Sequence, residues 1–176
     1  GEDWKALAAK KIQDRETANE SLILCDYSWP ILDLDSTGDH VGDPTLESSL
    51  LSAVTGRAID EDGLNRIGER IFNLQRAILV REGHRGREFD RPPDCCFMEP
   101  LKFDQVNPDC IVPGGNWEPV SRKGATLDRD SFEQMRDEYY HLRGWDVKTG
   151  LQTSAALEEL GLGDVARDLG ARGLLG

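Results

Sequence analysis

The sequence predicts a mainly α-helical protein, a multihelical domain with one long irregular segment at about residues 87–127. Three observations lead to this fold class. Apolar residues recur at three- and four-residue intervals in several stretches, capping residues and glycines stand at the ends of those stretches, and the alternation typical of strands is scarce. A chain of 176 residues is long enough to bury a core, so we expect residues 1–176 to form a single helical unit.

The N-terminal stretch predicts one or two helices between residues 2 and 26. Its apolar positions follow helical spacing with polar residues between them, and Cys25 lies at the C-terminal edge of this pattern. Pro30 interrupts the pattern, because a residue that precedes proline is pushed away from helical backbone angles. Residues 32–44, rich in glycine and aspartate, are expected to form a loop.

Two further helices are predicted before the irregular segment. Thr45 is placed to cap a short helix that Gly56 ends. Asp60 or a residue near it is placed to cap a helix of about twenty residues that ends at Gly83. The second helix carries a wide apolar stripe, so we expect it to be central and buried on more than one side. The stripe consists of Leu64, Ile67, Ile71, Leu74 and Ile78.

Residues 87–127 contain six of the eight prolines and show no sustained helical period. Such a long irregular segment is uncommon in a free-standing domain, so it either carries function or wraps another structural unit. Helical spacing resumes after Asp128 or Asp130 and ends at Gly144. Thr153 or Ser154 begins another short helix, and a last one follows Gly163.

Composition and charge exclude several classes of protein. Hydrophobic residues make up 38% of the chain and no apolar run is long enough to span a membrane. The net charge of −12 repels phosphate backbones, so nucleic acid is not expected as a partner. The chain begins with Gly1, which indicates a cut or processed start, and shows no secretory signal. Together with four cysteines that suggest no disulfide framework, this predicts a cytoplasmic protein.

The cysteines are the residues most open to a functional interpretation. Cys95 and Cys96 are adjacent and Cys110 follows after a gap, which is not the paired spacing of zinc or cluster ligands, so a structural role is favoured. Cys25 follows an apolar run. A lone cysteine there is commonly a core residue, but a thiolate beside apolar side chains also suits an iron–sulfur iron. Phosphate loops, nucleophile elbows and zinc-protease motifs are absent, so the chain alone is not expected to be an enzyme.

Two dense blocks of sequence indicate a family. They are GERIFNLQRAILVREG at residues 68–83 and DEYYHLRGWD at residues 137–146. Both resemble the C-terminal region of the tungsten-dependent aldehyde ferredoxin oxidoreductase family, and the resemblance extends from about residue 20 to about residue 169. It implies that the chain is the C-terminal part of a larger enzyme that oxidises aldehydes to carboxylates, or reduces the corresponding acid derivatives, with ferredoxin-type electron transfer.

The resemblance also implies where cofactors are contacted. The family has a motif Asp-x-x-Gly-Leu-Cys that contributes a pterin contact and the fourth ligand of a four-iron cluster. The match assigns Cys25 as the iron ligand and Glu20 and Leu24 as cofactor contacts. Glu20 replaces the family's Asp with a longer side chain, and Ile23 stands where the family keeps Gly. No catalytic residue is assigned within this chain.

The cofactors implied are a tungsten or molybdenum bis-pterin and a 4Fe–4S cluster, both shared with a missing upstream region. The implied partners are the upstream domains of the same enzyme, a ferredoxin or an iron–sulfur electron-transfer subunit, and a small aldehyde or acyl substrate. A second copy of the protein, in a homodimer, is a further partner to be expected. Two alternatives remain open: a cofactor-free helical interaction module related to the family, and a subunit of an aromatic thioester reductase of the benzoyl-CoA type.

Aromatic residues gather around residues 139–145, where Tyr140 and His141 precede Trp145. Most clusters of this kind are core packing in which a hydroxyl or imidazole finds a local partner. A place for Tyr140 or His141 in a substrate channel is the alternative, because aromatic walls commonly hold carbonyl substrates.

Overall fold

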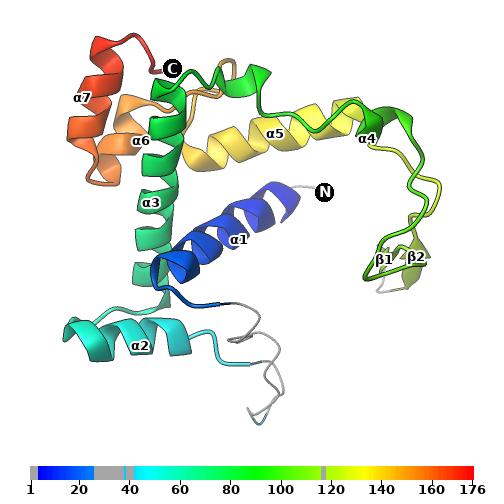
Figure 1. Cartoon of the computed structure of the whole chain (residues 1–176), viewed down its shortest axis with the longest axis horizontal. Coiled ribbons are helices and arrows are strands. Elements are labelled where there is room, and N and C mark those ends of the chain that lie inside the picture. The colour runs from blue at the N-terminus through cyan, green and yellow to red at the C-terminus, as the bar shows by residue number, and fades with distance from the viewer. Residues whose placement is uncertain (1–3, 26–37, 39–41, 116–117) are drawn as a thin grey trace.

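The computed structural model describes residues 4–25, 38, 42–115 and 118–176 (Figure 1). Within these residues it contains seven α-helices, a short 3₁₀ turn and one two-stranded sheet. The prediction of a mainly α-helical fold is confirmed. Most of the loop predicted at residues 32–44 lies outside the described residues.

The first three helices form the frame of the fold. They are α1 (Trp4–Ser21), α2 (Leu46–Thr55) and α3 (Glu61–Arg81). Helix α1 crosses α3 and also contacts α5 (Arg129–Arg143), while α2 lies against α3 near the C-terminal end of α1 (Figure 1). The crossing of α1 and α3 depends on Gly68, because a Cβ atom there would lie 1.9 Å from the carbonyl oxygen of Asp14.

Local capping sets several helix ends where the sequence predicts them. The carboxylates of Asp60 and Asp128 accept hydrogen bonds of 2.8 Å from backbone N–H groups three residues on. The Thr153 hydroxyl does the same at 3.2 Å for α6 (Ser154–Glu159). Gly144 adopts a left-handed conformation with φ of 65° after α5, which satisfies terminal carbonyls.

Thr45 precedes α2 as predicted but makes no side-chain cap. Its backbone is helical, with φ of −85° and ψ of −11°, whereas a capping residue needs an extended backbone. The Thr45 hydroxyl donates instead to the Asp43 carboxylate at 2.7 Å.

The segment at residues 87–127 is largely irregular, as predicted. Its regular parts are the end of a 3₁₀ turn (Gly86–Glu88), the one-turn helix α4 (Cys95–Met98) and the strands β1 (Ile111–Pro113) and β2 (Pro119–Ser121). The strands pair antiparallel, and this hairpin projects away from the helices (Figure 1).

The buried faces of the long helices differ from the predicted apolar stripes. Ile67, Leu74 and Ile78 of α3 are each exposed by about two fifths, so the expectation that this stripe is buried was wrong for them. The face of α3 that is buried mixes small, polar and apolar residues: Leu64, Gly68, Asn73, Arg76, Ala77 and Val80. The close crossing with α1 accounts for Gly68, where a side chain would not fit. Asn73 and Arg76 are buried together with their hydrogen-bond partners.

An apolar core forms where α3 meets the C-terminal helices α6 and α7 (Gly163–Ala171). Its buried members are Ala77, Leu157, Leu162, Ala166 and Leu169. The rest of the interior is built around hydrogen-bonded polar residues and aromatic rings.

Candidate functional site

The predicted cofactor segment, residues 20–25, follows directly from the end of α1. The Leu24 N–H donates to the carbonyl of Asn19 at 3.2 Å, and the Ile23 N–H donates to the carbonyl of Glu20 at 3.0 Å. Ile23 has a φ of 60°, in the left-handed region that favours glycine. This pair of bonds around a left-handed residue is the Schellman motif that commonly ends helices.

The Schellman motif gives a physical reason why glycine suits this position. The resembling motif has Gly here, and Gly adopts φ above zero without a Cβ penalty. This chain forms the left-handed turn with Ile23, a β-branched residue for which the conformation is strained.

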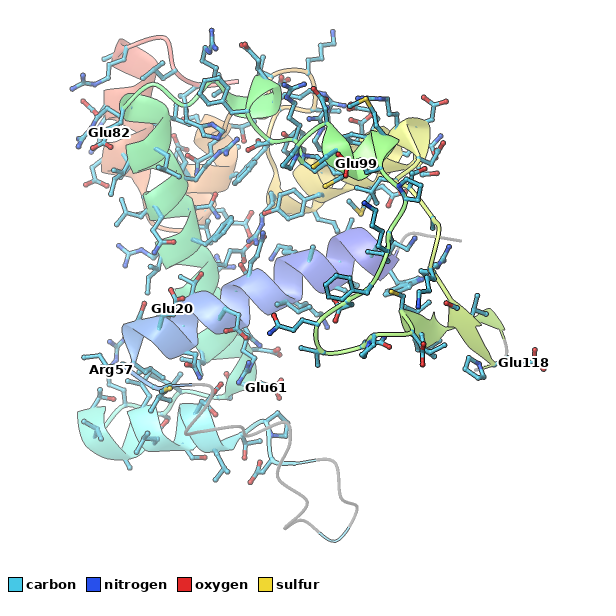
Figure 2. The ribbon with its side chains drawn as sticks, turned by 45° about the vertical axis from the view of Figure 1, so that its right-hand side comes forward. Glu20, Arg57, Glu61, Glu82, Glu99 and Glu118 are labelled. Carbon is cyan, nitrogen blue, oxygen red and sulfur yellow. The ribbon has the colours of Figure 1, made fainter. Side chains whose placement is uncertain are left out.

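The side chains of this segment face outward. Glu20 and Cys25 are exposed, Leu24 is half-buried and Ile23 is 92% exposed. Figure 2 shows Glu20 at the C-terminal end of α1, on the side of the fold where α2 lies. Cys25 is consequently not a core residue of this chain, and a group outside the chain can approach its thiol and the carboxylate of Glu20.

Buried polar contacts hold the end of α1 in place. Asn19 donates to the carboxylate of Glu47 on α2 at 2.7 Å, and Arg15 donates to the same oxygen at 3.1 Å. Both Asn19 and Glu47 are almost fully buried. The turn that precedes Cys25 is thus anchored to a second helix.

The side chains of this segment can supply one ligand to a metal cluster, the thiolate of Cys25. The described residues contain no group of three or more histidine, cysteine or acidic side chains that could hold a metal ion together. Cys25 fits the role of one outward-facing thiolate in a cluster whose other ligands belong to another region of polypeptide. The remaining cysteines do not join it: Cys95 is exposed, Cys96 is half-buried and Cys110 is buried. Desolvation and the neighbouring Cys95 raise the pKa of the Cys96 thiol, which disfavours its thiolate.

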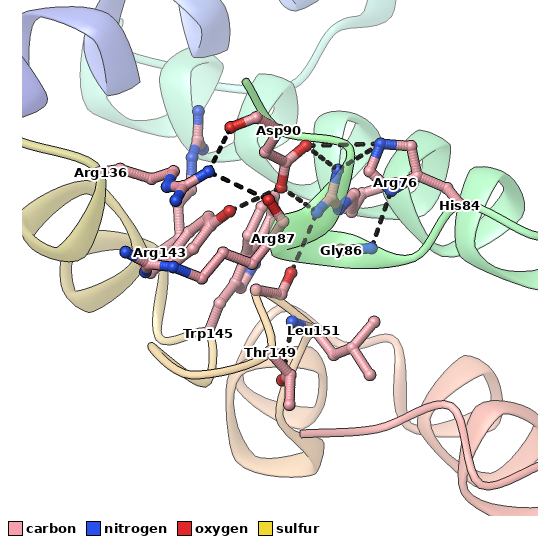
Figure 3. A network of polar contacts seen from close by, with 12 residues as sticks. Arg76, His84, Gly86, Arg87, Asp90, Arg136, Arg143, Trp145, Thr149 and Leu151 are labelled. Carbon is pink, nitrogen blue, oxygen red and sulfur yellow. Dashed lines mark hydrogen bonds and ion pairs between the residues drawn. The ribbon is translucent and has the colours of Figure 1, made fainter. Parts of the chain in front are cut away.

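A network that sequence reasoning missed centres on Arg76 of α3 (Figure 3). Arg76 is buried within the fold, with only 7% of it exposed. Its guanidinium group binds both carboxylate oxygens of Asp90: Nη1 donates to Oδ1 at 2.8 Å and Nη2 donates to Oδ2 at 2.5 Å. Nη2 also donates to the carbonyl of Gly150 at 3.0 Å. One side chain thus joins α3 to two loops.

Arg136 of α5 completes this arginine network from the opposite side. Its Nη1 donates to the carbonyls of Arg87 and Asp90 at 3.0 and 2.7 Å, and it forms an ion pair with Glu133. Only 9% of Arg136 is exposed. The Nε atoms of Arg76 and Arg136 are buried and have no acceptor within the part of the chain that the structure describes.

Two further groups of the arginine network are held in their neutral forms. Burial raises the pKa of Tyr140, and so does its hydrogen bond to the Asp90 carboxylate at 2.7 Å, so the phenol stays a donor. Burial and the charge of Arg76 lower the pKa of His84, although Asp90 opposes this. The Nδ1 of His84 accepts from the Gly86 N–H at 3.1 Å, which places the imidazole proton on Nε2.

The two sequence blocks that carry the family resemblance meet in the interior. The rings of Phe72 and Trp145 are stacked, with centroids 6.4 Å apart, and Arg143 lies 4.3 Å from the Phe72 centroid. Trp145 Nε1 donates to Asn73 Oδ1 at 2.9 Å. The two blocks that resemble the family therefore belong to one packed unit.

A cavity of about 370 Å³ lies between α1, α3 and α5. Aromatic and aliphatic side chains form most of its wall, and Arg76, Asp90 and Arg136 contribute its charged part. The lining residues are Ala6, Ala9, Gln13, Phe72, Gln75, Arg76, Leu79, Asp90, Phe132, Met135, Arg136, Tyr139, Tyr140 and Trp145. Tyr140 therefore lines a cavity as the channel interpretation requires, whereas His141 is exposed and does not line it.

Comparison with known proteins identifies the family. A family model described as aldehyde ferredoxin oxidoreductase, domains 2 and 3, matches residues 2–162. This chain belongs to the aldehyde ferredoxin oxidoreductase family. The resemblance seen in the two sequence blocks is thereby confirmed.

The chain spans only a small part of the relatives that it matches. It is 33% identical over 111 residues to the WOR-like subunit of an aliphatic sulfonate oxidoreductase from Pyrococcus furiosus, which is 62% of this chain and 15% of that subunit. Among solved structures it is similar to the BamBC active-site complex of benzoyl coenzyme A reductase in complex with 1,5-dienoyl-CoA. The TM-score is 0.50 and the identity 23%, over 76% of this chain and 16% of the other. This second similarity shows a shared fold.

In the described ranges, none of the helices combines the length and apolar character that crossing a bilayer requires.

Proposed function

We propose that this chain is the C-terminal portion of a larger tungsten- or molybdenum-pterin, iron–sulfur oxidoreductase that converts aldehydes to carboxylates, or reduces acid derivatives, with a ferredoxin-type electron carrier. Family membership supports the general assignment. The observation that carries the specific one is the exposed thiol of Cys25 directly after a left-handed turn at Ile23. Glycine, which the family's motif has at this position, suits such a turn because it has no Cβ atom.

In this proposal the chain closes one side of a cofactor pocket. Cys25 supplies the fourth thiolate of a 4Fe–4S cluster, and Glu20 and Leu24 contact the pterin. When bound, the metal and pterin supply the oxidation–reduction chemistry, while protein sets orientation, potential and access. The anchored end of α1 holds the thiol and the Glu20 carboxylate at a fixed spacing.

The proposal also accounts for apolar surface that the chain leaves uncovered. In the irregular segment Met98 is 67%, Phe103 is 68% and Val106 is 93% exposed. Large apolar side chains that are this exposed are available for contact with another surface. We assign this projecting segment to contact with the upstream domains of the same enzyme, located in the cytoplasm, with a ferredoxin or an iron–sulfur subunit as electron partner.

Cofactor content of the intact protein tests this function. We would express the protein that contains this chain anaerobically, as wild type, Cys25→Ala and Cys95→Ala, and measure iron and tungsten. Cys95 is a matched control because it is also exposed. We expect iron to fall markedly in Cys25→Ala and to stay at the wild-type level in Cys95→Ala. A Cys25→Ala protein with full iron would show that the ligand assignment is wrong, and a wild type without iron or tungsten would favour the cofactor-free module.

The substrate is the least constrained part of the proposal. By their names, one relative acts on aliphatic sulfonates and one structural neighbour on benzoyl-CoA. We propose a small aldehyde or acyl compound, and activity assays of the loaded protein against aldehydes, sulfonates and aryl thioesters distinguish these classes.

A further inference from the structure

The adjacent thiols of Cys95 and Cys96 on α4 form a cluster that the proposed function does not use. Cys95 is exposed, Cys96 is half-buried, and the two side chains are hydrogen-bonded to each other. A small disulfide in solution therefore meets Cys95 first and finds a second thiol directly beside it. We infer that Cys95 and Cys96 are a redox-active pair, which a low-molecular-weight disulfide oxidises to a disulfide between them. The inference does not rest on the proposed function.

Two successive thiol–disulfide exchanges account for the oxidation. The Cys95 thiolate attacks one sulfur of the small disulfide, whose S–S bond breaks, and the released thiolate takes up the proton that Cys95 lost. Cys96 then attacks the Cys95 sulfur of this mixed disulfide and releases the second small thiol in the same way. The pair loses two electrons and two protons, and the small disulfide becomes two thiols. Desolvation and the neighbouring Cys95 raise the pKa of the Cys96 thiol, which lowers its thiolate fraction, so Cys96 suits the second step.

The helical backbone of α4 is incompatible with this disulfide. Successive side chains of a helix point about 100° apart, and adjacent Cα atoms lie about 3.8 Å apart, below the roughly 4.4–6.8 Å that is usual across a disulfide. Closing the bond therefore requires the backbone of Cys95 and Cys96 to leave the helical region. A strained disulfide is also easily reduced, which makes the reaction reversible.

Two backbone hydrogen bonds depend on the helical form of the pair. The Cys95 carbonyl accepts from the N–H of Glu99, which Figure 2 shows beside α4, at 2.8 Å. The Cys96 carbonyl accepts from the N–H of Leu127 at 2.9 Å, and this bond joins α4 to the segment that leads into α5. Helix α4 has a single turn, so little helix is lost when it unwinds. Oxidation of the pair consequently releases the irregular segment from the start of α5.

Peptide mass spectrometry of the intact, anaerobically reduced protein tests the chemistry. After incubation with glutathione disulfide and alkylation of the remaining thiols, we expect the wild-type pair to have lost two hydrogens and to carry no glutathione. Cys96→Ser should retain one glutathione on Cys95, because the second exchange is blocked, and Cys95→Ser should react much more slowly. Cys110 is buried and should stay reduced throughout. A wild-type pair that stays reduced, keeps glutathione on Cys95, or reacts only together with Cys110 would overturn the inference.

Hydrogen exchange tests the structural consequence separately. In the oxidised protein we expect the amides of Glu99 and Leu127 to exchange roughly five- to tenfold faster, as loss of one hydrogen bond implies, and to recover on reduction with dithiothreitol. The amides of Leu101 and Gly124 are matched controls. They donate to the carbonyls of Ala125 and Leu101, each at 2.8 Å, and use neither cysteine. Unchanged exchange at Glu99 and Leu127 in fully oxidised protein would contradict the unwinding of α4.

Discussion

Gly68→Ala tests the close crossing of α1 and α3. Away from other structure, replacing a helical glycine by alanine stabilises a protein by about 1 kcal/mol. Here the added Cβ would lie 1.9 Å from the carbonyl oxygen of Asp14 and 3.2 Å from the Cβ of Ala18. Contacts below about 3 Å are essentially unknown for Cβ atoms, so the helices must separate by about 1 Å.

That separation disturbs a buried ion pair as well as the packing. Asp14 Oδ1 accepts from Arg143 Nη1 at 2.5 Å, and the two side chains are 5% and 0% exposed. Overpacking costs about 1–3 kcal/mol, and loss of a buried pair costs about 3–5 kcal/mol when it is complete. We combine the overpacking cost with a partial loss of the Asp14–Arg143 ion pair and subtract the gain of about 1 kcal/mol from alanine in a helix. The expected decrease in the free energy of unfolding is about 3 kcal/mol.

Thermal unfolding measures this effect. For a chain of this size about 3 kcal/mol lowers the melting temperature by roughly 6–12 °C. Gly170→Ala on α7 is the matched control, because its added Cβ would lie 3.4 Å from Leu175, an ordinary contact. We expect Gly170→Ala to be neutral or stabilising. A Gly68→Ala protein as stable as wild type, or two variants that lose equal stability, would refute the close-crossing argument.

Three further predictions concern single residues. Ile23→Gly should raise the free energy of unfolding by about 1 kcal/mol in denaturant titrations, because it relieves a left-handed isoleucine that is 92% exposed; a loss of stability would contradict this. Asn73→Leu should lower the free energy of unfolding, measured in the same titrations, by about 3 kcal/mol. The Asn73 side-chain oxygen accepts hydrogen bonds from Trp145 at 2.9 Å and from Gln152 at 2.7 Å, and leucine offers neither donor an acceptor. The pKa of His84 is lowered in the folded state, so the unfolded state binds a proton at a higher pH than the folded state does. The free energy of unfolding is therefore full above a pH of about 6.5 and falls as the pH drops below it. In His84→Gln, the free energy of unfolding measured against pH should lose this fall.

Helix positions were predictable because their signals are local. Asp60, Asp128 and Thr153 cap the helices that follow them, and each bond spans only three residues. Gly56 and Gly144 end helices in left-handed conformations, which glycine adopts without strain. These choices do not depend on distant parts of the chain.

The buried faces and the arginine network were not predictable in the same way. Arg76 is buried because Asp90, fourteen residues on in the irregular segment, and Gly150, seventy-four residues on, both meet it. The spacing of apolar residues along a helix does not indicate a partner so far away in the sequence. The exposed positions Ile67 and Leu74 follow helical spacing well, but in this chain the face opposite them makes the close crossing.

The candidate cofactor segment remains a prediction that rests on the family motif. A lone Cys25 carried no decisive signal, and two of the four positions that the motif defines, Glu20 and Ile23, depart from it. The left-handed turn at Ile23 is a backbone property, so side-chain identity alone concealed it.

The distance from the Cys25 sulfur to iron tests the central claim most directly. It would be measured in an experimental structure of the intact, anaerobically prepared protein with its metals bound. The account predicts a bond of about 2.3 Å between this sulfur and an iron of the cluster. A cluster with four other ligands and a Cys25 sulfur that contacts only protein or solvent would contradict it.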